Sequence, residues 1–219
     1  MRLLLLGCTG FVGRELLPLL LDAGHHLSVV SRRLPRGFDA ERADGRLQWL
    51  QLDPSRSQSW QVPELIDALE QADGVVNLAG EPIAEKRWTP AHRQQLETSR
   101  LDTTRHLVEA ISAAASPPSV LVNASAIGFY GTSTSARFLE SSAVGDDFLA
   151  SLCARWEAAA AAVPATTRQV TVRIGIVLAA DGGALGKMLP VFRTGFGGPI
   201  GDGRQWMSCL LYTSDAADE

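Results

Sequence analysis

The chain has 219 residues and a mass of 23.4 kDa, long enough for one large domain with a substantial buried core. Hydrophobic residues make up 46% and charged residues 20%, which is typical of ordered globular proteins and excludes disordered or collagen-like classes. The net charge is -4, from 20 Lys and Arg against 24 Asp and Glu, so no basic field is present to bind nucleic acid through its phosphates.

Short aliphatic runs alternate with longer segments of helical period along the chain. This alternation predicts βαβ units around a parallel sheet, and strands covered on both faces need no alternation of polar and apolar residues. In chain order we expect strands at 2–6, 26–31, 47–52, 74–78, 119–124 and 169–178. Helices are expected at 11–23, 63–71, 90–115, 146–162 and 184–194. The predicted fold class is α/β, a doubly wound parallel sheet of the Rossmann type.

The cysteines and the apolar runs indicate the compartment. Cys8, Cys153 and Cys209 are widely separated and include no C-x-x-C pair, so they predict neither a disulfide framework nor a zinc site. The four histidines do not form a ligand set either, so we expect no metal. No apolar stretch approaches the ~20 residues of a membrane-spanning helix. We therefore expect a cytoplasmic protein with neither membrane nor nucleic-acid partners.

A glycine-rich turn, G-C-T-G-F-V-G from Gly7 to Gly13, follows the first expected strand and opens the first expected helix. Glycines let a backbone turn tightly and approach a diphosphate closely, and a helix N-terminus offers free amides and a partial positive charge to phosphate. The alternative is that the glycines only tighten the turn, since their spacing differs from strict G-x-G-x-x-G. We predict cofactor contacts from Gly7, Thr9, Gly10, Phe11, Val12 and Gly13.

The second expected strand ends in basic residues. A protein that selects NAD places an acidic residue here against the ribose hydroxyls, whereas this chain has Ser31, Arg32 and Arg33. These side chains suit the 2′-phosphate of NADP, and one charge-assisted bond of ~1.5 to 3 kcal/mol gives about ten- to a hundredfold discrimination. The alternative is an ordinary solvated charge pair. Asp53, after the third strand, is a candidate adenine contact or, before Pro54, a turn former.

Several motifs in order carry a family resemblance. They are the Gly7–Gly13 turn, N-L-A-G at 77–80, N-A-S-A-I-G-F-Y-G at 123–131 and R-I-G-I-V-L at 173–178. With them the chain resembles the extended or atypical short-chain dehydrogenase/reductases, the NAD-dependent epimerase/dehydratase-like proteins. D-F-L at 147–149, W-E at 156–157 and the glycine-rich segment 195–208 make it similar to an epimerase-like subfamily within that branch. The resemblance covers residues 1 to 208.

The resemblance implies roles for two loops. The N-x-A-G loop backs the cofactor ribose in such relatives, so Asn77, Ala79 and Gly80 are expected to contact the cofactor. The serine after the fifth strand faces the nicotinamide and the substrate, so Ser125 is expected in the catalytic site. The alternatives are an Asx turn at Asn77 and a strand-end hydroxyl at Ser125 that satisfies local backbone.

The proton-transfer pair of this superfamily, Tyr-x-x-x-Lys, is absent. In that pair the lysine lowers the pKa of the tyrosine, so that the phenol can exchange a proton with a substrate oxygen. Neither Tyr130 nor Tyr212 has a lysine four residues further on. Counting back from the W-E motif, the two positions fall on about Leu149 and Cys153.

Other residues are candidate substitutes for the missing pair. They are Tyr130 as a displaced acid, Ser125 as a hydroxyl donor, and Glu140 or Glu157 as a base. Tyr130 is also explained by packing, and Glu157 by a surface or interhelix contact.

The domain organisation follows from the same resemblance. Residues 1–180 are expected to form an NAD(P)-binding Rossmann domain, and 181–208 the start of a substrate lobe in which Arg204 and Gln205 hold an anionic or polyhydroxyl ligand. The alternative for the glycine-rich part is a flexible connection. Relatives continue beyond this point, so we expect an incomplete C-terminal lobe, a truncated chain and a non-native tail at 209–219.

These observations predict an NADP-dependent oxidoreductase or epimerase-like enzyme that acts on an unidentified small substrate, with nucleotide sugars among the candidates. NADP is favoured over NAD as the cofactor. The alternative is a catalytically inactive NADP-binding sensor or interaction protein, which the missing Tyr-x-x-x-Lys pair favours. The sequence leaves the oligomeric state open.

Overall fold

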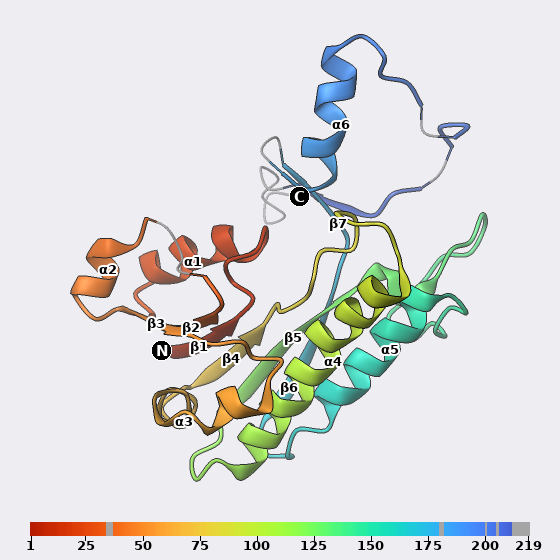
Figure 1. Ribbon diagram of the computed structural model, residues 1–219. Helices are drawn as coiled ribbons and strands as arrows, with labels where there is room; N and C mark the ends of the chain where they lie inside the picture. The colour runs from red at the N-terminus through yellow and green to blue at the C-terminus, as the bar shows by residue number, and fades with distance from the viewer. Residues whose placement is uncertain (34–36, 180–181, 200, 205, 212–219) are drawn as a thin grey trace. The chain divides into compact units, whose positions relative to one another are not determined.

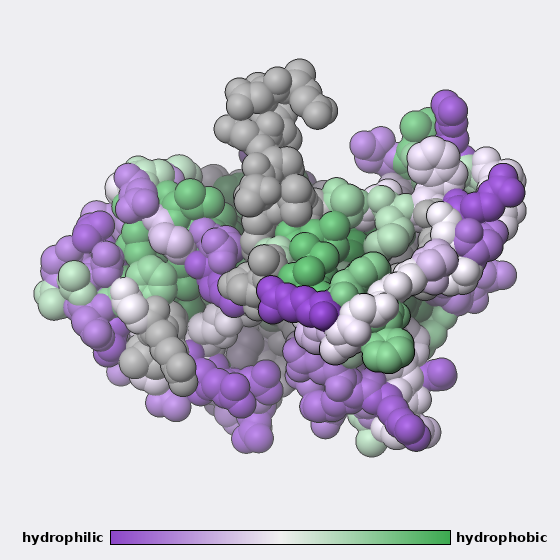
Figure 2. Space-filling view, turned by 90° about the horizontal axis from the view of Figure 1, so that it is seen from above, coloured by the Kyte–Doolittle hydropathy of each residue, from purple (hydrophilic) through white to green (hydrophobic). Residues whose placement is uncertain are grey.

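The computed structural model describes residues 1–219 except 34–36, 180–181, 200, 205 and 212–219 (Figure 1). The chain divides into two compact units, and both are discontinuous in sequence. The first unit contains Met1–Ser125 and Leu152–Val172, and the second contains Ala126–Ser151 and Arg173–Glu219. The expected boundary at residue 180 stays a prediction. Charged and polar residues cover much of the face in Figure 2, with apolar patches between them.

A six-stranded parallel sheet forms the centre of the first unit, in the order β3-β2-β1-β4-β5-β6. The strands are β1 (Arg2–Leu6), β2 (His26–Ser31), β3 (Leu47–Gln51), β4 (Gly74–Asn77), β5 (Val120–Ala126) and β6 (Arg168–Ile174). β1 pairs with β2 on one side and with β4 on the other, so the chain changes its direction of winding between β1 and β4. This is the Rossmann order, which confirms the predicted fold class.

Helices cover both faces of this sheet. They are α1 (Gly13–Asp22), α2 (Asp39–Ala43), α3 (Pro63–Glu70), α4 (Pro90–Ala113) and α5 (Phe148–Ala161), with a short 3-10 helix η1 (Ser57–Gln61). α4 begins as its sequence predicts, because Thr89 Oγ1 accepts a hydrogen bond from His92 N at 3.2 Å and Pro90 occupies the first turn.

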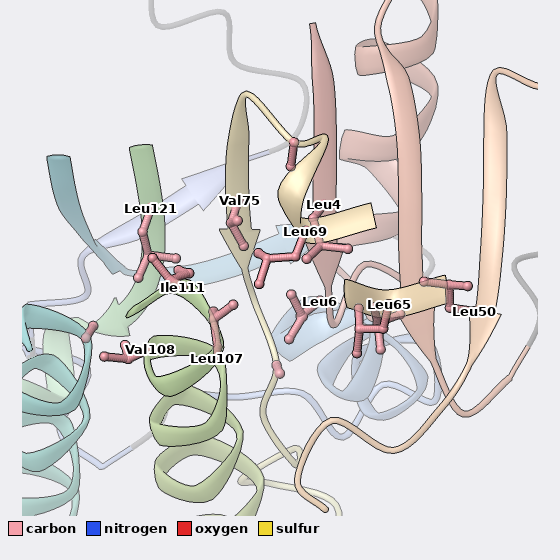
Figure 3. Packing of buried hydrophobic residues seen from close by; sticks show 14 residues of the cluster. Leu4, Leu6, Leu50, Leu65, Leu69, Val75, Leu107, Val108, Ile111 and Leu121 are labelled. Atoms are coloured by element: carbon pink, nitrogen blue, oxygen red, sulfur yellow. The ribbon is translucent and has the colours of Figure 1, made fainter. Parts of the chain in front are cut away.

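Two apolar clusters hold the helices to the sheet, and β1 supplies both. Leu4 and Leu6 belong to the cluster with residues of α3 and α4, whereas Leu5 belongs to the cluster with residues of α1. Figure 3 shows the first cluster, in which Leu65 of α3 and Leu107 of α4 flank the strand residues. Successive residues of a strand point to opposite faces, so each fully buried leucine adds about 1.5 to 3 kcal/mol to one layer or the other.

The second unit contains η2 (Ile127–Tyr130), α6 (Gly183–Arg193) and a parallel pair of strands, β7 (Ile176–Ala179) and β8 (Cys209–Leu211). The expectation of one strand over 169–178 is wrong, because the strand is interrupted at Gly175, which separates β6 from β7. A Cβ at Gly175 would lie 2.7 Å from Ser208 O, and Ser208 O accepts a hydrogen bond from Ile176 N at 2.9 Å. The absence of a side chain at Gly175 therefore lets Ser208, just before β8, approach the backbone between β6 and β7.

Smaller differences concern the ends of elements and short helices. α1 begins at Gly13 rather than residue 11, and the short helices α2, η1 and η2 have no counterpart among the expected elements. Among the described residues, no helix combines the length and apolar character needed to cross a bilayer.

Candidate functional site

The glycine turn between β1 and α1 is shaped by close backbone contacts. Gly7 has φ +75°, and a Cβ there would lie 2.5 Å from Ala79 N of the loop after β4. A Cβ on Gly13 would lie 2.2 Å from Cys8 Cα, so only glycine lets α1 begin this close to the strand end. The first and third glycines are therefore required by the fold itself.

The middle of the turn is open by comparison. Gly10 N donates to Gly7 O at 3.1 Å, and a Cβ on Gly10 would meet only that same oxygen, at 3.2 Å. Thr9 and Gly10 are exposed, and Phe11 and Val12 are partly exposed, directly before the first turn of α1. Arg14 N and Glu15 N of the first turn donate to Gly10 O at 2.9 Å and Val12 O at 3.2 Å, so a phosphate at this helix start would contact the exposed turn before them. This combination of exposed backbone and helix start fits a dinucleotide diphosphate.

The end of β2 presents two arginines beside a buried serine. Ser31 Oγ donates to Arg33 O at 2.6 Å and accepts a hydrogen bond from Trp49 Nε1 at 3.0 Å. The hydroxyl hydrogen of Ser31 is thus engaged in shaping the turn, while Arg32 and Arg33 are exposed. The groups at the end of β2 that are exposed and positively charged are therefore Arg32 and Arg33.

Asp53 forms a turn after β3. Its Oδ1 accepts hydrogen bonds from Ser55 N at 3.1 Å and Ser55 Oγ at 2.7 Å. Its Oδ2 lies 3.6 Å from Arg56 Nε. This geometry matches the turn-former alternative, and the adenine contact of Asp53 stays a prediction.

Asn77 links the end of β4 to α4 and β5. The side chain is fully buried, and its Oδ1 accepts from Ala79 N at 3.1 Å, which is the Asx turn of the alternative interpretation. Its Nδ2 donates to Thr104 Oγ1 at 2.9 Å and to Asn123 Oδ1 at 2.7 Å. All three bonds together fix the path of the loop that lies against Gly7.

Arg100 is a half-buried cation in contact with this loop. It donates to Glu81 O at 3.1 Å and Leu96 O at 3.2 Å, and its Cζ lies 5.3 Å from the ring centroid of Trp156. Burial lowers the pKa of Arg100. A Cβ on Gly80 would lie 2.9 Å from Arg100 Cζ, so Gly80 gives the guanidinium its space.

Glu81 lies among basic groups at the same edge of the sheet. The hydrogen bond from Lys86 Nζ, at 2.8 Å, lowers the pKa of Glu81, and the charges of Arg32 and His92 act in the same direction. The charge of Arg32 therefore favours the ionised form of Glu81.

Ser125 at the end of β5 pairs with a carboxylate. Its Oγ donates to Glu157 Oε1 of α5 at 2.5 Å, and Ser125 is only 3% exposed. The surface or interhelix contact expected for Glu157 did not include this bond to a strand residue. The sequence contains one signal for this pair. Glu157 lies one helical turn after Cys153, which is about the expected lysine position, so it is on the helix face expected to point to the site.

Tyr130 belongs to an aromatic cluster in the second unit. Its hydroxyl accepts from Arg173 Nη1 at 2.8 Å, and its ring stacks on Phe138 at a centroid distance of 5.1 Å. Arg173 also lies over the Phe129 ring, with its Cζ 3.6 Å from the centroid. These contacts agree with the packing alternative for Tyr130.

The remaining expected site residues are in the second unit. Arg204 is exposed, and its backbone N donates to Asp202 Oδ1 at 3.0 Å. Gln205 lies outside the described residues. Within the described part of the chain, no group of three or more His, Cys, Asp or Glu side chains is arranged to hold a metal ion.

Sheet order, glycine turn and basic strand end together define a Rossmann-type dinucleotide fold. Residues 3–168 match the NAD dependent epimerase/dehydratase family, and the chain belongs to this family, as its motifs predicted. Human epimerase family protein SDR39U1 is 40% identical over 209 residues, which cover 94% of this chain and 64% of the relative. YfhF of Bacillus subtilis is 34% identical over 219 residues, covering 99% of this chain and 68% of the relative.

Solved structures agree with this membership. The crystal structure of human SDR39U1 (isoform 2) with NADPH has a TM-score of 0.79 and 38% identity, covering 96% of this chain and 66% of that one. WbmG of Bordetella bronchiseptica, solved with NAD and UDP, is 16% identical with a TM-score of 0.77 and shares the fold. The chain thus spans about two thirds of the length of these proteins.

Proposed function

We propose that this chain is the cofactor-binding part of an NADP-dependent oxidoreductase or epimerase-like enzyme that acts on a small molecule. The observation that carries the proposal is the pairing of an open glycine turn at the start of α1 with two exposed arginines at the end of β2. The first suits a diphosphate and the second a 2′-phosphate. The human relative solved with NADPH supports the same choice of cofactor.

The residues proposed to hold the cofactor come from three strand ends of one sheet. They are the turn from Gly7 to Gly13, Arg32 and Arg33 after β2, and the Asn77–Gly80 loop after β4. Ligands of open parallel sheets bind beyond the carboxyl ends of the strands, where the direction of winding changes. When bound, NADP supplies hydride chemistry at its nicotinamide, and Ser125 near the carboxyl end of β5 is proposed to face that ring.

Nucleotide sugars are the first substrate class to test, with Arg204 and Gln205 of the proposed substrate lobe as candidate contacts. The competing proposal is an NADP-binding sensor without chemistry. It is favoured by the absence of a Tyr-x-x-x-Lys pair, whose positions, counted back from the W-E motif, fall on about Leu149 and Cys153. NADPH binding without turnover on a broad set of carbonyl compounds and sugar nucleotides would support the sensor.

The cofactor proposal is tested by replacing the two arginines together. Arg32→Ala with Arg33→Ala is expected to weaken NADPH binding about ten- to a hundredfold while changing NADH binding less than about threefold, since only NADPH carries the 2′-phosphate. Fluorescence titration of the reduced nicotinamide measures both. Arg105→Ala, at an exposed position of α4, is the control and should change neither affinity. An equal loss for the two cofactors would contradict the proposal.

We also propose that the protein is located in the cytoplasm. Cys8, Cys153 and Cys209 are free thiols, which suits the reducing cytoplasm. An Arabidopsis thaliana relative, 37% identical over 206 residues, is chloroplastic, so fractionation of the native host is the deciding measurement.

A further inference from the structure

One face of α5 contains the positions expected for the Tyr-x-x-x-Lys pair and also a carboxylate, that of Glu157. Leu149, Cys153 and Glu157 follow one another at intervals of four residues, and residues so spaced share a helix face. Counted back from the W-E motif, the family's tyrosine and lysine fall on about the first two positions. Glu157 is the next residue of that face, and its side chain can carry a proton.

The contact with Ser125 gives this carboxylate a route to the proposed site. Ser125 lies at the carboxyl end of β5, and its hydroxyl donates to Glu157 Oε1 at 2.5 Å. This length is typical of a charge-assisted bond between a hydroxyl and a carboxylate. Because the hydroxyl hydrogen points to Glu157, the lone pairs of Ser125 Oγ are left to accept a proton from another group.

We propose that Glu157, acting through Ser125, moves the proton that the Tyr-x-x-x-Lys pair moves in other members of the family. This rests on the proposed function. In the oxidation of an alcohol, the substrate O–H bond breaks and its proton goes to Ser125 Oγ, while Ser125 passes its own proton to the Glu157 carboxylate. NADP+, when bound, would supply the acceptor for the hydride of the substrate carbon, which becomes a carbonyl. In reduction every transfer runs in reverse, and protonated Glu157 is the proton source.

The other candidate for this role has a different environment. Tyr130 is held in a stack with Phe138 and Arg173, and its hydroxyl accepts a bond from the guanidinium. Ser125 and Glu157, by contrast, both belong to the first unit, which also contains the glycine turn. The proton route is therefore placed in the same unit as the proposed cofactor site.

The direct test is Glu157→Gln in the full chain. Glutamine keeps an oxygen that accepts the Ser125 hydroxyl bond but cannot take up a proton. The probes are NADPH with phenanthrenequinone, nitrobenzaldehyde or glyceraldehyde, and NADP+ with UDP-glucose. We expect Glu157→Gln to lower kcat at least about a hundredfold, with KM and the Kd for NADPH within about twofold of wild type. Glu157→Asp should recover part of the lost kcat. Glu109→Gln, an exposed carboxylate on α4, should leave all of these values unchanged.

A second readout needs neither cofactor nor substrate. In the apo chain, Ser125→Ala and Glu157→Leu should each lower the urea midpoint, and the double variant should lose clearly less than the sum, because both single changes break the same bond. Additive losses would overturn the pairing on which the proposal depends.

The outcomes separate this proposal from the proposed function. Glu157→Gln with wild-type kcat in an active wild-type chain overturns the proton route and leaves the enzyme assignment standing. A wild-type chain that binds NADPH and turns over none of the probes overturns both the proton route and the enzyme assignment. A chain that binds no NADPH overturns the cofactor assignment as well.

Discussion

Buried polar side chains at the residue scale explain why the loops of the proposed site hold their shape. Asn77 makes three hydrogen bonds from a fully buried position, and Ser125 makes its bond to Glu157 with 3% exposure. Leaving a buried polar group without a partner costs about 1–3 kcal/mol. These residues therefore stabilise one conformation of each strand end, which is what a site for a rigid cofactor ring requires.

Cys8, inside the glycine turn, gives a prediction about pH. It is buried, and burial raises its pKa from the ordinary value 9.0 to about 12. The folded chain thus keeps this proton where the unfolded chain releases it, so the stability is complete below pH 9 and is lost as the pH rises toward 12. Urea unfolding of the wild type should lose about 1.4 kcal/mol per pH unit in this window from Cys8.

The Cys8→Ala variant isolates this effect from other groups that titrate at high pH. Its stability should fall less steeply above pH 9 than that of the wild type, whereas Cys209→Ala, at an exposed cysteine, should follow the wild type. Identical slopes for Cys8→Ala and wild type would show that Cys8 is not held as a buried thiol.

Close backbone contacts at the scale of elements decide where β1 ends and α1 begins. Gly7 combines a left-handed backbone with contacts to the loop after β4, whereas Gly24, after α1, has φ +78° and open space around the position that a Cβ would take. A side chain at either position would have the same backbone penalty, but only at Gly7 would it also clash with neighbouring atoms. Comparing the two therefore measures how much the close packing of the turn contributes to the free energy of unfolding.

Gly24→Ala should cost about 1–2 kcal/mol, the penalty for a non-glycine residue in left-handed conformation. Gly7→Ala should cost more than about 3 kcal/mol, because its Cβ would also lie 2.5 Å from Ala79 N. Chemical denaturation of both variants measures the difference. Equal costs would mean that the turn does not lie against the loop after β4 as described.

The strands of the main sheet were predictable because aliphatic runs are local signals. The ends of β1, β2 and β4 were placed within a residue, and with them the glycine turn and the arginines. The break at Gly175 was not predicted, because its cause is the approach of Ser208, which is distant in sequence. Similarly, the sequence indicates Glu157 as a candidate base, but its bond to Ser125, 32 residues away, depends on how α5 packs against β5.

At the scale of the whole molecule, the order of the sheet brings distant segments to one edge. The glycine turn, the arginines after β2, the Asn77 loop and Ser125 all lie at carboxyl ends of strands in a single parallel sheet. A dinucleotide extends across such an edge, with its diphosphate at the central helix. Fold, charge and family membership therefore lead to the same ligand.

A crystal structure of the chain with NADPH tests this account most directly. We predict the diphosphate against the backbone between Gly7 and Gly13, the 2′-phosphate within hydrogen-bond distance of Arg32 or Arg33, and the nicotinamide on the side of Ser125. NADPH bound with its diphosphate away from the start of α1, or with its 2′-phosphate in solvent and out of reach of both arginines, would contradict it.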